Sequence, residues 1–253
     1  MQTAAHPSWG RRTWPVALVG WVGVLALLGQ PLPAVPADLA AQWAALPHWA
    51  QRAVLIVQPG LLVLAASAVG AAVAHRVGLR SALAGTGACP RGQTWAGVAL
   101  LGACVGGLVH GLDRLWAPHL GTAWQALAHA QSAQPSPPWW IGPLYGGLAE
   151  EVIARWGVMS LLAWGLARVW GEHRQRLALA LAVVVSALAF GAAHLPMLAA
   201  HIDLSPAIVV RTLALNALGG VVYAVVFIRH GLEAAMAAHA STHLGLLAAR
   251  AWG

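Results

Sequence analysis

Seven long apolar runs constrain this fold more than any other feature of the sequence. Crossing the hydrocarbon core of a bilayer takes about 20 predominantly apolar residues in an α-helix. Only helices and closed barrels satisfy their backbone polar groups in lipid, and runs of this length are helical. We therefore predict an all-α, polytopic membrane helix bundle with about seven transmembrane helices, at residues 13–29, 53–74, 94–112, 141–168, 177–198, 206–228 and 230–249.

The composition agrees with a membrane protein. Of the 253 residues, 59% are hydrophobic and only 8% are charged, which is typical of a chain that contacts the lipid bilayer. The basic residues are arginines scattered between apolar runs, so we expect no nucleic acid partner. Cys89 and Cys104 form no metal-ligand pattern and are assigned no function. We expect residues 1–253 to form a single integral membrane domain.

The distribution of arginine predicts the orientation of the chain. Cytoplasmic segments of membrane proteins carry an excess of basic residues. Placing the N-terminus inside leaves Arg52, Arg114 and Arg250 in outside segments. We expect this orientation, in a bacterial inner (cytoplasmic) membrane. The arginines that it places on the cytoplasmic side are Arg11, Arg12, Arg76, Arg80, Arg91, Arg168, Arg174, Arg176 and Arg229.

The stretch GGLAEEVIARWG places three charged residues inside the fourth apolar run: Glu150, Glu151 and Arg155. Charges at membrane depth are costly, and they usually face the bundle interior and serve a site or pathway. On an α-helix, Glu151 and Arg155 share one face and can form an ion pair, whereas Glu150 points about 100° away. A polar network that only fixes helix packing is the alternative, but a second carboxylate without a local partner favours a functional site.

Histidines in two later runs can complete that site. His194 follows the stretch LAFGAA near the end of the fifth run. His239 and His243, in AAHASTHLG, are four residues apart and share a face of the last run. In the predicted topology these imidazoles and the acidic pair reach similar depths, in the middle-to-outer part of the membrane.

Carboxylates and imidazoles in one pocket are suited to activating water. A carboxylate can act as a general base, and an imidazole can donate a hydrogen bond to the oxyanion that forms when an amide carbonyl is attacked. No serine or cysteine nucleophile motif competes with this interpretation. A proton or metal transporter could use the same groups, but the expected paired half-repeats are absent from the sequence.

These three motifs, in this order, resemble those of the CPBP family, which includes the CAAX prenyl endopeptidases and the bacterial Abi-type intramembrane proteases. EEVIAR matches EExxxR, FGAAH matches FxxxH, and HASTH resembles an HxxxN-type motif. The resemblance covers a catalytic core at residues 140–250. It implies an intramembrane endopeptidase that cleaves a membrane-anchored protein or peptide, and the predicted depth of the site suggests access from the outer leaflet.

The resemblance also implies a role for each residue. Glu150 would be the general base that activates water, and His194 would help to hold that water. Glu151 and Arg155 would shape and charge-balance the site. His239 would stabilise the oxyanion, helped by the last motif position, where this chain has a histidine in place of asparagine.

That substitution, His243, leaves the metal question open. The set Glu150, His194, His239 and His243 could also bind Zn²⁺, although we favour a water activated by glutamate with no required cofactor. Another alternative is a non-catalytic relative that acts as a membrane partner or immunity protein. Outside the site, we expect Arg211 to extend to the outer interface and Glu233 to pair with Arg229.

Overall fold

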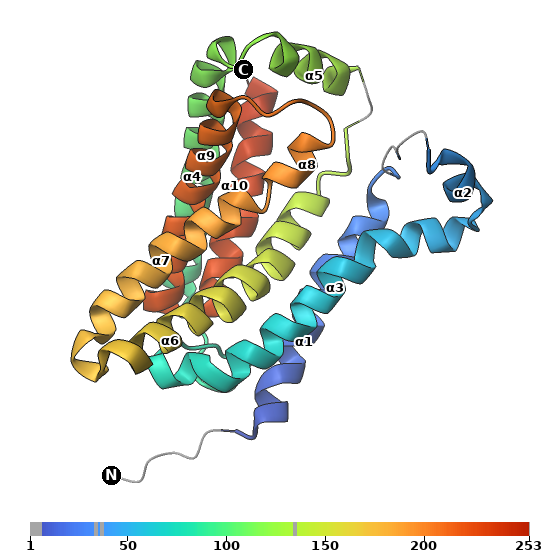
Figure 1. Cartoon of the computed structure of the whole chain (residues 1–253). Coiled ribbons are helices and arrows are strands. Elements are labelled where there is room, and N and C mark those ends of the chain that lie inside the picture. The colour runs from blue at the N-terminus through green and yellow to red at the C-terminus, as the bar shows by residue number, and fades with distance from the viewer. Residues whose placement is uncertain (1–6, 33–34, 36–37, 134–135, 253) are drawn as a thin grey trace.

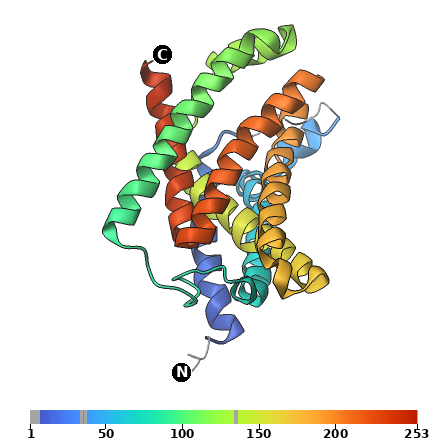
Figure 2. The same ribbon diagram turned by 90° about the vertical axis from the view of Figure 1, so that its left-hand side faces the viewer.

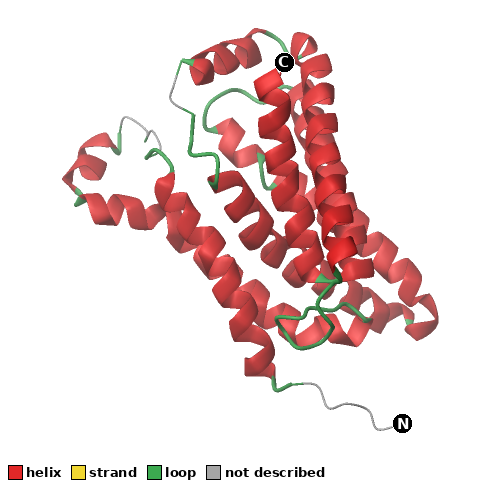
Figure 3. Cartoon of the chain, turned by 180° about the vertical axis from the view of Figure 1, so that it is seen from behind, coloured by secondary structure: helices red, strands yellow, loops and turns green. Residues whose placement is uncertain are grey.

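The computed structural model describes residues 7–32, 35, 38–133 and 136–252, and all regular structure in these ranges is helical (Figures 1 and 3). Short 3₁₀ turns extend or link several helices, at Leu27–Gly29, Ala74–Val77, Ala117–His119 and Glu172–Arg174. Two π-helical segments, η4 (Gly142–Glu150) and η5 (Val152–Met159), lie in the middle of the chain. The α-helices are α1 (Trp9–Ala26), α2 (Ala40–Ala45), α3 (His48–Val73), α4 (Gly92–Trp116), α5 (Thr122–Ser132), α6 (Ser160–Trp170), α7 (Gln175–Ala192), α8 (Leu195–Ala199), α9 (Pro206–His230) and α10 (Leu232–Trp252).

The predicted all-α membrane bundle is confirmed. Within the described residues, six helical stretches are long and apolar enough to cross a membrane: Trp9–Gly29, His48–Val77, Gly92–His119, Gly142–Trp170, Gln175–Ala199 and Pro206–His230. They correspond to the first six predicted runs. The seventh run is α10, which is helical but is not among the six. Its histidines, its hydroxyl side chains and its terminal charges make it less apolar than the others.

The segment η4–η5 lies at the centre of the bundle. It packs against α1 and α3 on one side and against α7, α9 and α10 on the other. Helices α4, α9 and α10 form a neighbouring group, seen side by side in Figures 1 and 2. The described N-terminal end of α1 lies at the opposite end of the bundle from α5 (Figure 1). The charged residues of the fourth run are therefore enclosed by helices from both halves of the chain.

The central segment is π-helical where α-helical geometry was predicted. In a π-helix each N–H bonds to the carbonyl five residues earlier, so a turn holds more residues, and successive side chains diverge less than on an α-helix. The predicted angle of about 100° between Glu150 and Glu151 applies to an α-helix, and a π-helical turn makes it somewhat smaller. Both carboxylates face the same neighbouring helix. Apolar periodicity over a single run cannot reveal this change of helix type.

Glycines bring α4 and α10 into backbone contact. A Cβ on Gly102 would lie 2.9 Å from the carbonyl carbon of Ala238 and one on Gly106 would lie 2.7 Å from the backbone N of Leu246, while one on Gly245 would lie 2.8 Å from Cα of Ala103. Small residues allow this close approach between membrane helices. This packing fixes the position of α10, the helix that carries His239 and His243, relative to α4.

Two polar residues have partners other than those expected. Arg211 donates from Nε to Oδ1 of Asp113 at 2.7 Å, so it ties α9 to α4 and does not simply extend to the interface. Glu233 accepts from Ser81 Oγ at 2.6 Å and from the backbone N of Leu83 at 2.9 Å, and thus holds the loop before α4. In both cases the partner comes from a distant part of the chain.

Candidate active site

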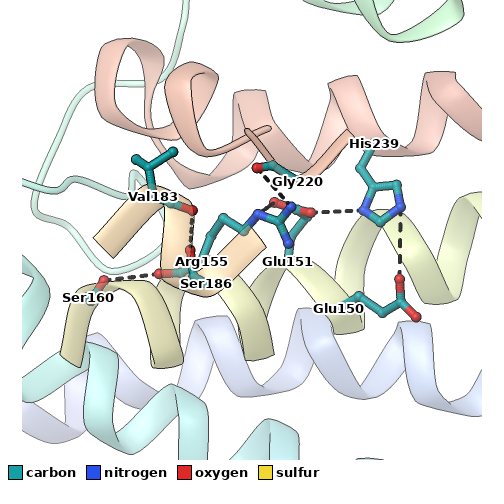
Figure 4. A network of polar contacts seen from close by, with 8 residues as sticks. All are labelled: Glu150, Glu151, Arg155, Ser160, Val183, Ser186, Gly220 and His239. Atoms are coloured by element: carbon teal, nitrogen blue, oxygen red, sulfur yellow. Dashed lines mark hydrogen bonds and ion pairs between the residues drawn. The ribbon is translucent and has the colours of Figure 1, made fainter. Parts of the chain in front are cut away.

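Glu151 lies at the centre of a buried polar network (Figure 4). Its side chain is 0% exposed. One carboxylate oxygen, Oε1, is 2.8 Å from Nδ1 of His239, and the other, Oε2, is 3.4 Å from Nε of Arg155. The ion pair predicted within this segment is present, and it is linked directly to α10.

Arg155 connects this network to two further helices. Its Nη2 donates to the carbonyl of Gly220 on α9 at 3.2 Å. The guanidinium carbon lies 4.8 Å from the ring centroid of Phe190 and 5.3 Å from that of Tyr223, within the range of cation–π attraction. Within the described residues, its buried Nη1 has no hydrogen-bond partner. The charge of this buried arginine is therefore balanced by one carboxylate and two aromatic faces.

Glu150 reaches the same imidazole from another direction. Its Oε2 is 3.9 Å from Nε2 of His239, and its side chain is 19% exposed, whereas Glu151 is fully buried. The two adjacent carboxylates therefore flank the two nitrogens of one histidine (Figure 4). Glu151 anchors the ring at Nδ1, and Glu150, the more exposed of the two acids, lies nearer Nε2.

Aromatic rings hold the plane of His239. Tyr223 stacks on it with centroids 4.3 Å apart and an angle of 16°, and His243 stacks at 5.2 Å with the same angle. Phe190 meets the ring edge-on at 5.8 Å. Offset stacked and edge-to-face arrangements of this kind are favourable. The imidazole is thus oriented by packing as well as by its hydrogen bond.

His194 joins the group through Phe190. It lies two residues after the end of α7, just before α8, and its Nδ1 is 2.8 Å from the carbonyl oxygen of Phe190. The two rings meet edge-on, with centroids 4.9 Å apart. Phe190 thus contacts both His194 and His239. If Nδ1 carries the proton donated to that carbonyl, Nε2 of neutral His194 is an acceptor.

Two glycines of η4 make room for the imidazoles of α10. A Cβ added to Gly142 would lie 2.6 Å from Nδ1 of His243. One added to Gly146 would collide with Nε2 of His243 and would lie 3.1 Å from Nε2 of His239. The histidines therefore lie directly against the backbone of the segment that carries the acidic pair.

The four residues considered for zinc do not fit a zinc site in this conformation. In the ranges that the structure describes, no group of three or more His, Cys, Asp or Glu side chains is arranged to hold a metal ion. The Nδ1 atom of His239 is hydrogen-bonded to Glu151. Its Nε2 is 3.9 Å from Oε2 of Glu150, which is farther apart than two ligand atoms of one tetrahedral zinc ion. Metal independence remains a prediction.

All six predicted site residues thus lie in one neighbourhood, five of them in the packed network and His194 beside it. Sequence reasoning missed Tyr223, the carbonyl of Gly220, and the two glycines under the imidazoles. Tyr223 carried a weak signal, because the chain has only two tyrosines and this one lies inside an apolar run. The Gly220 carbonyl and the two glycines carried no signal in the sequence, because their roles depend on how the helices pack.

Comparison with known proteins agrees with the motifs. Residues 132–245 match the family model described as type II CAAX prenyl endopeptidase Rce1-like. That range contains all six site residues and nearly coincides with the predicted core. No curated protein and no solved structure was found to match the chain. The predicted resemblance to the CPBP family of CAAX proteases is confirmed for residues 132–245, the part of the chain that matches this family model.

Proposed function

We propose that this protein is an intramembrane endopeptidase that hydrolyses a peptide bond in a membrane-anchored protein or peptide, using water activated by Glu150. The observation that carries the proposal is the placement of one imidazole, His239, between two carboxylates of different exposure. The match of residues 132–245 to the model of a protease family supports the same reaction class.

Glu150 is the proposed general base. The 3.9 Å between its Oε2 and Nε2 of His239 is too long for a direct hydrogen bond, and it is a separation that one water molecule can bridge. A water in that position would give its proton to Glu150 as it attacks the substrate carbonyl. The protonated carboxyl group would then give the proton to the departing amine.

His239 is proposed to stabilise the oxyanion, and this role constrains its protonation. The ring nitrogen Nδ1 is hydrogen-bonded to Glu151. For Nε2 to carry a proton as well, His239 and Glu151 must together hold two protons, one on Nε2 and one between Nδ1 and the carboxylate. The form is either an imidazolium beside the Glu151 carboxylate or an Nε2–H imidazole beside a protonated Glu151. In both forms Nε2–H can donate to the developing negative charge.

His194 and His243 have supporting roles in this mechanism. With Nδ1 donating to the Phe190 carbonyl, neutral His194 offers Nε2 as an acceptor for a water proton. His243, stacked on His239, stands where the family motif has asparagine. As a neutral imidazole it can supply a second hydrogen bond to the substrate carbonyl.

We further propose that the substrate enters from the outer leaflet. His194 is at the C-terminal end of α7, beside α8, which is the end of the bundle nearer α5 (Figure 1). With the N-terminus inside, as the arginine distribution predicts, that end faces outward. The membrane segment of an exported protein is then the expected kind of substrate.

Membrane proteomes test the reaction directly. The native host lacking this protein would be complemented with the wild type or with Glu150→Gln, and new N-termini in membrane proteins would be mapped. We expect specific cleavages with the wild type only, while Glu150→Gln inserts and unfolds in detergent like the wild type. Cleavage by Glu150→Gln would remove the proposed base.

The same experiment separates the alternatives. A non-catalytic partner or immunity protein should give no new N-termini, and its effect on the host should survive Glu150→Gln. A proton or metal transporter should also produce no cleavage, but it should move its ion in proteoliposomes. Either pattern would overturn the protease proposal.

A further inference from the structure

A membrane-exposed groove lies between α4 and α9, away from the acidic pair and its histidines. This cavity of about 370 Å³ is lined by small and apolar side chains along most of its length and ends at Arg229 and His230. Its apolar walls are Gly97, Val98, Leu101, Val225 and Val226.

A second cavity, of about 200 Å³, adjoins the first at that end. Three arginines line it, namely Arg80, Arg91 and Arg229. Thr94, Arg229 and His230 line both cavities. The apolar groove therefore opens into a basic pocket where α4 begins and α9 ends.

The pocket carries an excess of positive charge. Its three arginine residues are exposed. Glu233 also lines the pocket, but its carboxylate accepts hydrogen bonds from Ser81 Oγ and from the backbone N of Leu83. One acidic group against three guanidinium groups leaves the pocket complementary to an anion.

We propose that this composite site binds one anionic diacyl phospholipid, with an acyl chain in the α4–α9 groove and the phosphate among the arginines. A basic pocket between membrane helices, next to an apolar groove, provides both parts of such recognition. The order of the features matches a lipid, because the basic end lies at the termini of two membrane helices and the apolar part lies deeper. None of the lining residues belongs to the proposed active site, so the inference does not depend on the protease proposal.

Two variants test the two halves of the site. A Cβ at Gly97 meets nothing within 4 Å and Gly97 lines the groove, so we expect the side chain of Gly97→Leu to extend into the groove without disturbing the helix. Gly107→Leu is the matched control, since Gly107 lies on the same helix, is equally open and lines neither cavity. Arg229→Gln removes one charge at the junction, and Arg168→Gln removes an exposed arginine of α6 outside both cavities.

The measurement is native mass spectrometry of the purified full-length protein in detergent. The protein would be titrated with palmitoyl-oleoyl phosphatidylglycerol and, separately, with phosphatidylcholine of the same chains. We expect one phosphatidylglycerol to bind in preference to phosphatidylcholine. Arg229→Gln should weaken binding about fivefold or more, the loss that corresponds to one arginine–headgroup contact. Gly97→Leu should also weaken binding, because it occupies the space of the acyl chain, while both controls behave like the wild type.

Three results would overturn the proposal. Equal binding of the two lipids would show that the arginines do not select the headgroup. Undiminished binding by Gly97→Leu would show that no acyl chain occupies the groove. If Arg229→Gln does not fold, the binding by Gly97→Leu alone tests the proposal. Displacement of the lipid by soluble glycerol 1-phosphate at equal concentration would indicate a phosphate site only. Because Glu150→Gln should bind phosphatidylglycerol like the wild type, this test and the protease test fail independently.

Discussion

The carboxylate of Glu151 and Nδ1 of His239 are hydrogen-bonded at 2.8 Å, although the two residues are 88 positions apart in the chain. This contact joins the central π-helical segment to α10. It also decides which imidazole nitrogen faces Glu150. In the proposed mechanism Glu151 therefore orients His239 and sets its protonation, in the way that a buried carboxylate orients the histidine of a hydrolytic triad.

Glu151→Gln should greatly reduce activity. The amide keeps the size of the side chain but carries no charge, so it can neither balance Arg155 nor pair with an imidazolium at His239. We expect cleavage of the substrate identified in the proteome to fall by about 10²-fold or more, comparable to losing an oxyanion donor. Glu151→Gln with wild-type cleavage rates would contradict the proposed role of the pair.

Arg155→Met alone should destabilise the fold more than the double variant Arg155→Met, Glu151→Gln does. Removing only the arginine leaves the buried Glu151 carboxylate without its cation, at a cost of about 3–5 kcal/mol. Adding Glu151→Gln removes that charge as well and should recover part of the loss. Unfolding in detergent, measured for both single variants and the double variant, gives the coupling free energy. Additive effects would mean that the two groups do not interact.

Tyr223 should support His239 through its ring. Tyr223→Leu removes a stacked contact worth about 0.5–1.5 kcal/mol, so we expect a several-fold loss of kcat/KM with little change in the membrane level of the protein. Tyr223→Phe keeps the ring and should retain most activity. An equal loss in both variants would instead implicate the hydroxyl group.

The sequence predicted the fold well because run length alone identifies membrane helices, and the interhelical packing is not needed for that inference. It also singled out Glu150, Glu151, Arg155 and the histidines, which the structure brings together, because charged and imidazole groups are rare in apolar runs. The π-helix and the stacking of Tyr223 on His239 were not predictable. They depend on the register between helices, and the same apolar pattern is compatible with several registers. The partner of Arg211, Asp113, was missed for the same reason.

Gly146 should be intolerant of even one added carbon. The Cβ of Gly146→Ala would collide with Nε2 of His243 and press on His239, so we expect a loss of activity that exceeds any loss of stability. Gly165→Ala on α6 is the matched control, because a Cβ there meets nothing within 4 Å. If both alanine variants cleave like the wild type, the imidazoles do not need their close position against η4.

His243→Asn restores the commoner family motif and tests the role of a metal. If His243 only donates to the substrate carbonyl, asparagine can replace it, and we expect activity within about tenfold of the wild type, in line with one retained hydrogen bond. Activity should also survive prolonged incubation with a chelator, and the purified protein should contain no stoichiometric zinc by elemental analysis. If a metal is required, the substitution should reduce bound zinc and cleavage together, and zinc should restore the activity of the chelated wild type. That combination would replace the glutamate-activated water with a metal-bound one and would require the four side chains to draw closer than they are here.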